Sequence, residues 1–185
     1  MRPVNLNALT IAMPIHIIID GYNLIRQSTT LSALDQQDIM LGREALVKRL
    51  AAYRKIKSHR ITVVFDARHS PRFSQRNDRH QGIAIRFSSR GESADDVIKR
   101  MAQQEREKAL VVSSDREIAN FAALCGAATM SSPQFEDKIE AAMLGDRNAG
   151  AGEIESGGLP RTKKKGPSRR LPKKLRRNRM KIKKL

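Results

Sequence analysis

Five aspartates of the chain stand near the ends of short apolar segments, where their carboxylates can gather. Asp20 and Asp66 directly follow apolar runs that predict buried β-strands, and Asp115 comes shortly after a third such run. Asp95 and Asp96 lie in the first turn of a predicted helix that follows a further strand. Because the carboxyl ends of parallel strands meet at one edge of a sheet, we expect these five side chains to share one rim.

Each of these acids also has an ordinary explanation, because aspartate caps backbone N–H groups at helix starts and complements the helix dipole. For most of them taken singly, capping is the better explanation. Asp20 is the exception, because the strand before it is an isoleucine-rich core strand and no helix is predicted to begin directly after it. The hypothesis of a shared site therefore depends on Asp20 converging with Asp95 and Asp115.

Carboxylates that crowd together repel one another and raise each other's pKa unless a cation neutralises them. The chain has one cysteine, Cys125, and four scattered histidines, so the ligand spacings typical of zinc sites are absent from the sequence. Oxygen ligands alone favour Mg²⁺ or Mn²⁺ as the cofactor. An ion of this kind can activate water and stabilise charge on a phosphodiester, so the predicted chemistry is phosphodiester cleavage.

Strand-like and helix-like segments alternate along the first 145 residues, which predicts an α/β domain with a parallel sheet and helices on both faces. The strand-like segments are rich in β-branched residues, and several helices begin at capping residues. A polar stretch at 67–82 is expected to be a long exposed loop. The predicted strands cover about 15–19, 61–65, 83–87, 110–112 and 127–130, and the predicted helices cover about 39–57, 93–108, 114–124 and 132–144.

Charge divides the chain unevenly. It carries 36 Lys/Arg against 19 Asp/Glu, for a formal net charge of +17, and residues 161–185 hold 14 of the basic residues and no acid. We therefore predict a loose extension at 1–12, the α/β domain at 13–145, a flexible linker at 146–160 and a disordered basic tail at 161–185. A chain with this tail seeks a polyanion, and nucleic acid is the commonest one.

Two groups of basic residues are candidates for RNA contact. Those in the polar stretch beside Asp66 could steer phosphates toward the acidic rim, although a solvated loop explains them equally well. Those in the tail could bind RNA through counterion release, and a faint apolar stripe at helical spacing there is compatible with ordering on RNA. The first group is Arg68, Arg72, Arg76 and Arg79, and the second is Lys163, Lys164, Lys165, Arg169, Arg170, Lys173, Lys174, Arg176 and Arg177.

No membrane role is expected. No apolar run reaches the roughly 18 residues that a membrane span needs. The apolar stripe of the tail is too sparse, and the tail too poor in aromatic residues, to favour a membrane surface. The lone cysteine has no partner for an internal disulfide, which is typical of a reducing compartment and predicts a cytoplasmic location. The sequence gives no indication of the oligomeric state.

Four segments in a fixed order resemble the YacP-type branch of the NYN domains, which are relatives of the PIN-like nucleases. The resemblance covers about residues 14–144 and leaves out the basic tail and residues 1–12. Each segment alone is weak, but four in order, each at a predicted strand end, are specific. The segments are IIIDGYNLI, ITVVFDAR, FSSRGESADDVIKRMA and ALVVSSDREI.

The resemblance implies a PIN-like fold, a Mg²⁺ or Mn²⁺ site built from acids, and endoribonuclease activity, with an association with ribosomes and translated messenger RNA. It makes Asp20 the central metal ligand and Asp115 the acid that completes the site. Asp95 and Asp96 would bind the metal or orient the attacking water, and Asp95 is the stronger candidate of the two. Asn23 would be a further polar contact to metal or phosphate.

Three further residues take lesser roles under the same resemblance. Asp66 is expected at the edge of the site. Glu92 fits the role of an ordinary loop acid and the role of a metal ligand equally well. Ser114 is expected to cap a helix and to support the site residues through a contact.

Two other classes of function were weighed against a metal-dependent endoribonuclease. A non-catalytic RNA- or ribosome-binding module with the same fold is the alternative, and the apparently complete set of acids favours catalysis over it. A phosphatase or a nucleotide-binding Rossmann enzyme is disfavoured, because the sequence has neither a GxGxxG nor a GxxxxGK[ST] motif, and no DxD motif after the first strand.

Overall fold

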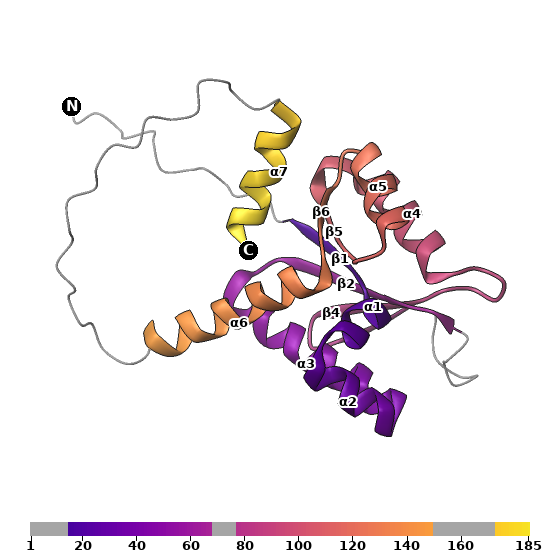
Figure 1. The fold of residues 1–185 in the computed structure, drawn as a ribbon, viewed down its shortest axis with the longest axis vertical. Coiled ribbons are helices and arrows are strands. Elements are labelled where there is room, and N and C mark those ends of the chain that lie inside the picture. The colour runs from indigo at the N-terminus through magenta and orange to yellow at the C-terminus, as the bar shows by residue number, and fades with distance from the viewer. Residues whose placement is uncertain (1–14, 68–76, 150–172) are drawn as a thin grey trace, which may run out of the picture.

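A computed structural model describes residues 15–67, 77–149 and 173–185 of the chain. The predicted extension at 1–12, the residues Arg68, Arg72 and Arg76, and residues 150–172 lie outside the described residues. Within the described ranges the chain forms one sheet and its covering helices (Figure 1). The strands are β1 (His16–Asp20), β2 (Arg60–Phe65), β3 (Asn77–His80), β4 (Ile83–Phe87), β5 (Ala109–Val112) and β6 (Ala128–Met130).

The sheet has six strands in the order β3-β4-β2-β1-β5-β6, and only β3 is antiparallel to its neighbour. This confirms the predicted α/β class, and all five predicted strands are present. The helices are α1 (Gly21–Gln27), α2 (Thr29–Gln37), α3 (Ile39–Lys57), α4 (Ala94–Glu105), the short 3₁₀ turn η2 (Arg106–Lys108), α5 (Arg116–Leu124), α6 (Ser132–Ala149) and α7 (Lys173–Lys184).

Helices cover both faces of the sheet because alternate residues of a buried strand point to opposite sides. Ile17 and Ile19 pack in the larger core with apolar residues of α3 and α6, whereas Ile18 packs in a smaller core with residues of α4 and α5. Figure 1 shows α4 and α5 on one side of the sheet and α3 and α6 on the other. None of the helices in the described ranges is long and apolar enough to cross a membrane.

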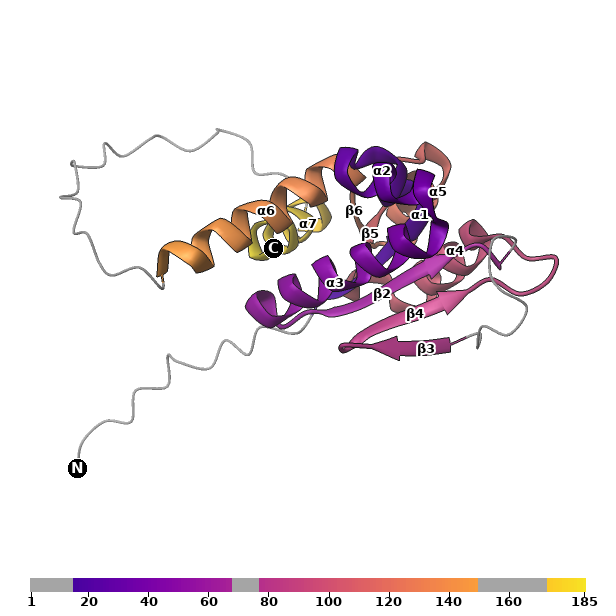
Figure 2. The same cartoon turned by 90° about the horizontal axis from the view of Figure 1, so that it is seen from below.

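The predicted exposed loop at 67–82 is wrong in its last part. Residues 77–80 form β3, which pairs with β4 in an antiparallel hairpin at the outer edge of the sheet (Figure 2). Gln81 and Gly82 connect the two strands with φ values of 50° and 83°. Positive φ at both positions is typical of the tight turn whose twist matches two antiparallel strands, and glycine favours it.

The expectation that no helix begins directly after Asp20 is also wrong. Asp20 ends β1 and is the N-cap of α1, with its side chain accepting a hydrogen bond from the backbone N–H of Asn23. Gly21 permits this abrupt change, because a side chain at this position would overlap the ring of Phe65. The first helical turn can therefore lie directly against β2.

The prediction of a disordered tail at 161–185 fails for its last 13 residues, which form α7 and a buried end. Leu185 is only 4% exposed and belongs to the larger core, and Ile182 packs against the same core. The hydroxyl of Tyr53 donates a hydrogen bond to the carbonyl oxygen of Leu185 over 3.2 Å. Two apolar residues thus anchor a strongly basic helix to the domain. The predicted linker also begins too early, since α6 continues to Ala149.

Candidate active site

A pocket of about 400 Å³ opens where β1 and β5 end and α4 begins. Three of the predicted ligands line it, namely Asp20, Asp95 and Asp115. Four of the five aspartates predicted to share one rim therefore line one pocket, since Asp66 lies there as well, whereas Asp96 does not line it. The other lining residues are Tyr22, Asn23, Arg26, Gln27, Asp66 and Ala94.

Asp20 is the most buried acid of the pocket, with an exposed fraction of 9%. Its Oδ1 accepts a hydrogen bond from the backbone N–H of Asn23 over 3.2 Å, and its Oδ2 accepts one from the hydroxyl of Ser113 over 3.1 Å. Burial raises its pKa from 3.8 to about 6, against the lowering effect of these two hydrogen bonds. The charges of Asp95 and Asp115 raise the pKa further.

Asp95 and Asp115 approach Asp20 from the starts of two helices. Asp95 lies in the first turn of α4, and its pKa is raised by partial burial and by the charge of Asp115. Asp115 is the N-cap of α5 and accepts hydrogen bonds from the backbone N–H groups of Glu117 and Ile118. The one carboxylate of Asp115 thus caps the helix and also lines the pocket.

Among residues 15–67, 77–149 and 173–185, no group of three or more acidic, histidine or cysteine side chains is close enough to form a ready metal cluster. The charges of Asp95 and Asp115 raise the pKa of Asp20, but the three acids do not form a closed cage. Their chemistry nevertheless fits Mg²⁺ or Mn²⁺, because Mg²⁺ usually keeps several waters and binds through one or two carboxylates together with phosphates. A buried carboxylate that two neighbouring carboxylates destabilise is the kind of group a cation would stabilise.

Asp96 and Glu92, both predicted near the site, do not line the pocket. Asp96 forms the predicted capping box with Ser93, and its side chain accepts hydrogen bonds from the backbone N–H and the hydroxyl of Ser93. Glu92 pairs with Arg100 and accepts a hydrogen bond from the backbone N–H of Ser89. These contacts hold the start of α4 and the loop before it, and they give both acids a structural role.

The side-chain oxygen of Asn23 connects three elements around the pocket. It accepts hydrogen bonds from the backbone N–H of Ser114 over 2.9 Å and from the hydroxyl of Ser132 over 2.7 Å. Because this oxygen is already engaged by α6 and by the turn after β5, the amide nitrogen is the group left to meet a phosphate. Ser114 was predicted to cap α5, but it does not. Its hydroxyl donates a hydrogen bond to the side-chain oxygen of Gln27 over 2.9 Å.

Arg26, Ser113 and Ser132 are site residues that were not predicted from the sequence. Arg26 is the one basic residue among the described residues that line the pocket, and its guanidinium lies 5.7 Å from the ring centre of Tyr22. Asn23 and Arg26 are three residues apart on α1, and Gln27 is four residues from Asn23, so the three share one helical face. A prediction of α1 would have placed Arg26 and Gln27 on the same helical face as Asn23. Nothing in the sequence indicates that Ser132 is buried at this site.

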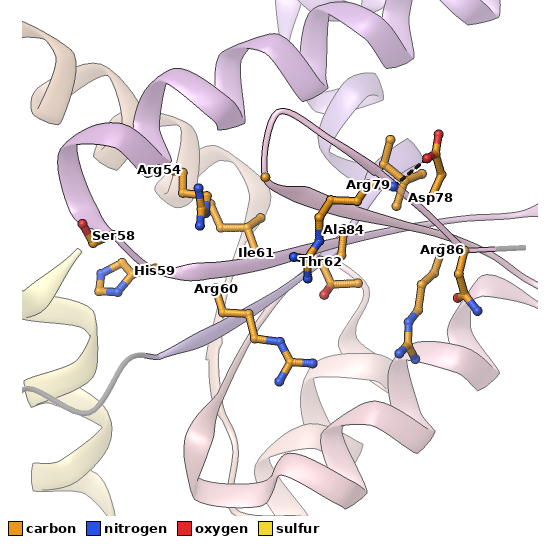
Figure 3. A pocket seen from close by; sticks show the side chains of 13 residues that line it. Arg54, Ser58, His59, Arg60, Ile61, Thr62, Asp78, Arg79, Ala84 and Arg86 are labelled. Atoms are coloured by element: carbon orange, nitrogen blue, oxygen red, sulfur yellow. Dashed lines mark hydrogen bonds between the residues drawn. The ribbon is translucent and has the colours of Figure 1, made fainter. Parts of the chain in front are cut away.

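Of the arginines predicted to contact RNA, Arg79 lies outside this pocket. It lines a second, larger cavity on the β3–β4 side of the sheet, together with Arg54, Arg60 and Arg86 (Figure 3). Arg176 lies on α7 and is exposed, and Lys173, Lys174 and Arg177 are also in that helix. The other predicted tail contacts fall in residues 150–172.

Comparison with known families identifies one sequence profile, described as the YacP-like NYN domain, which matches residues 17–183. The match extends through most of α7, whereas the resemblance was expected to cover only about residues 14–144. The curated protein described as uncharacterized protein YacP, from Bacillus subtilis (strain 168), is 29% identical over 87 residues. That alignment covers 47% of this chain and 51% of the relative, so the chain spans about half the length of this relative.

Two crystal structures of Rae1 (YacP) from Bacillus subtilis have the same fold. One aligns with a TM-score of 0.62 and 26% sequence identity, and the alignment covers 75% of this chain and 80% of the chain in the crystal structure. The other, a point mutant, aligns with a TM-score of 0.61 and 23% sequence identity, and the alignment covers 72% of this chain and 80% of the mutant chain. The likeness establishes the PIN-like NYN fold that the sequence analysis predicted.

Proposed function

The chain belongs to the YacP-like NYN domain family, and from this premise we propose that it is a metal-dependent endoribonuclease acting on ribosome-associated or messenger RNA. The observation that carries the proposal is the acidic pocket. Asp20 is buried there with a pKa of about 6, and Asp95 and Asp115 line the same pocket from two other elements. Such a concentration of carboxylate is costly to the fold, which supports a role in cation-assisted chemistry.

Asp20, Asp95 and Asp115 would hold Mg²⁺ or Mn²⁺, with water in the remaining coordination positions. The bound ion would supply Lewis-acid activation of water and neutralise charge on the scissile phosphate. The hydroxyl of Ser113 orients the Asp20 carboxylate through its hydrogen bond to Oδ2. Asp95 is half-buried with a raised pKa, which suits it to accept a proton from the attacking water.

Two groups of the pocket have the chemistry to bind the phosphate itself. The Asn23 amide nitrogen is a neutral donor at a position fixed by the contacts of its oxygen. The Arg26 guanidinium supplies a positive charge beside three carboxylates. Together they would counter the repulsion between an RNA phosphate and the acidic pocket.

The basic helix α7 supports RNA as the substrate. Eight of its twelve residues are Lys or Arg, and it is fixed to the catalytic domain through Leu185. A fixed patch of this charge binds the phosphate backbone without reading its sequence, as a ribosome-associated enzyme requires. The proposed setting is the cytoplasm, where ribosomes and messenger RNA are found.

The test is cleavage of a fluorescent single-stranded RNA, free or bound to ribosomes, with Mn²⁺, Mg²⁺ or a chelator. We expect metal-dependent cleavage that Asp20→Asn lowers by about 100-fold or more. Asp137→Asn, which removes an exposed acid of α6, is the matched control and is expected to cleave normally. RNA binding without cleavage under all conditions would refute the nuclease and favour the non-catalytic binding module.

A further inference from the structure

The sheet face that carries α4 is open at its β3–β4 edge. Ile83, Ile85 and Phe87 point to the α3 side, so Ala84 and Arg86 point to the α4 side by strand alternation. The helix α4 packs mainly on β1, β2 and β5, which leaves the outer strands less covered. A cavity of about 680 Å³ occupies this place (Figure 3).

Arginines dominate this open surface, which we call the arginine face and define as Arg54, Arg60, Arg79 and Arg86. Figure 3 shows Arg60 and Arg86 pointing to the same side of the strands, with Arg79 between them. Arg54 reaches the cavity from α3, and its guanidinium lies over the turn at Gly82. The floor between the arginines is made of small residues such as Thr62 and Ala84.

The charge of the arginine face is poorly compensated by the protein. Arg60 forms an ion pair with Glu105 over 3.3 Å. Within the described parts of the chain, no ion pair joins Arg54, Arg79 or Arg86 to an acid. Asp78 also lines the cavity, and its side chain accepts a hydrogen bond from the backbone N–H of Arg79. Four guanidinium groups around one cavity outnumber these two acids and repel one another, and a bound anion relieves that repulsion.

The strand register connects the arginine face to the acidic pocket. Asp20 pairs with Val64 in the sheet, and Val64 pairs with Arg86. Arg86 is therefore on the same row and the same face as Asp20, two strands away, or about 10 Å between the backbones. Arg79 is one row further back, in line with Ala84 and Thr62. Arg60 begins β2 a further row behind, so the arginines recede stepwise from the site.

We infer that the arginine face binds the sugar–phosphate backbone of the RNA strand whose scissile phosphate occupies the acidic pocket. The inference rests on the proposed function for the position of the cut. It identifies the substrate as single-stranded RNA that lies across β4 and β3 away from Asp20. Guanidinium groups match phosphate oxygens in a two-pronged geometry, and the described lining of the cavity has no Phe, Tyr or Trp of the kind that anchors a protein partner.

The test compares Arg79→Gln/Arg86→Gln with Lys48→Gln/Lys55→Gln, a control that removes two exposed charges from α3 on the opposite face. The probe is a short labelled single-stranded RNA, bound by proteins that also carry Asp20→Asn to prevent cleavage. We expect the arginine variant to bind about tenfold more weakly than the control. Its slope of log affinity against log salt should fall by about 1.4, for two lost phosphate contacts.

Thermal melting of both variants checks that each is folded, and the same substitutions in the active protein separate binding from chemistry. We expect KM for RNA to rise about tenfold while kcat at saturating RNA stays near the parent value. Equal affinity and equal KM in the two double variants would overturn the inference and leave the nuclease standing. Loss of binding to whole ribosomes with full binding to RNA would also overturn it, because the arginines would then contact protein.

The proposed function can fail separately. If the parent protein never cleaves RNA, the nuclease is refuted, yet selective loss of RNA binding in the arginine variant would still support the arginine face.

Discussion

The hydroxyl of Ser113 donates a hydrogen bond to Oδ2 of Asp20 over 3.1 Å, which joins the end of β5 to the end of β1. The hydroxyl oxygen of Ser113 in turn accepts a hydrogen bond from the backbone N–H of Asp115 over 3.2 Å. One buried hydroxyl thus links two of the proposed ligands. Because a hydrogen bond to the ionised form lowers a carboxyl pKa, Ser113 keeps Asp20 more often charged at neutral pH than burial alone would allow.

The first prediction concerns the pH dependence of folding stability in a chelator. The pKa of Asp20 is about 6 in the fold and 3.8 ordinarily, so the fold binds the proton more tightly than the unfolded chain. The contribution of Asp20 to stability therefore falls as pH rises from about 4 to about 6. Asp20→Asn removes this cost and is expected to raise the free energy of unfolding at pH 8 by up to about 3 kcal/mol.

Urea unfolding of both proteins across this pH range provides the measurement. The gain from Asp20→Asn should shrink as pH falls below about 6, and Mn²⁺ should stabilise the parent protein but not the variant. A gain that is the same at pH 4 and pH 8 would contradict the raised pKa. Ser113→Ala should raise the pKa of Asp20 further and so move the fall in stability to higher pH.

The second prediction separates two adjacent acids of α4. Asp95→Asn removes a pocket carboxylate and is expected to lower kcat by about 100-fold, because it takes charge from the reacting centre. Asp96→Asn weakens the capping box with Ser93 and is expected to lower the melting temperature while kcat stays near the parent value. Cleavage assays and thermal melting of both variants check this, and a kcat loss in Asp96→Asn as large as that in Asp95→Asn would disprove the division of roles.

The third prediction concerns the anchor of α7. Leu185→Ala removes a buried side chain from the core and is expected to lower the free energy of unfolding by about 2–3 kcal/mol. Tyr53→Phe, which loses the hydrogen bond to the Leu185 carbonyl, is expected to cost about 1 kcal/mol. Leu124→Ala, at a leucine that is 83% exposed, is the matched control for denaturant unfolding. If Leu185→Ala were no more destabilised than this control, α7 would not be anchored as described.

The strands and the position of the acids could be predicted because both follow from local pattern. Continuous β-branched runs identify buried strands, and the rule that strand ends share one edge brings Asp20, Asp95 and Asp115 to one pocket. The capping box of Ser93 and Asp96 follows from spacing alone. Pattern does not give side-chain distances, so it could not show that these acids line an open pocket and that the described residues form no closed metal cluster.

The elements that were missed depend on contacts between distant residues. The sequence Asp20-Gly21 is typical of a turn, and only the closeness of the Phe65 ring explains why glycine begins a helix there. All four residues of β3 are exposed, so no apolar alternation marks the strand. The charge of α7 predicts an unfolded tail, but Leu185 meets a core that is assembled from residues far away in the chain.

Under the proposed function, docking of α7 would make nucleic acid a stabilising ligand of the whole domain. Since Leu185 is part of the core, the helix that carries the basic residues is lost when the domain unfolds, and an RNA bound to it must then be released. Thermodynamic linkage requires that such an RNA shift the folding equilibrium toward the native state in proportion to the logarithm of its concentration. Protein molecules bound to RNA would therefore resist heat and proteolysis longer than molecules without bound RNA.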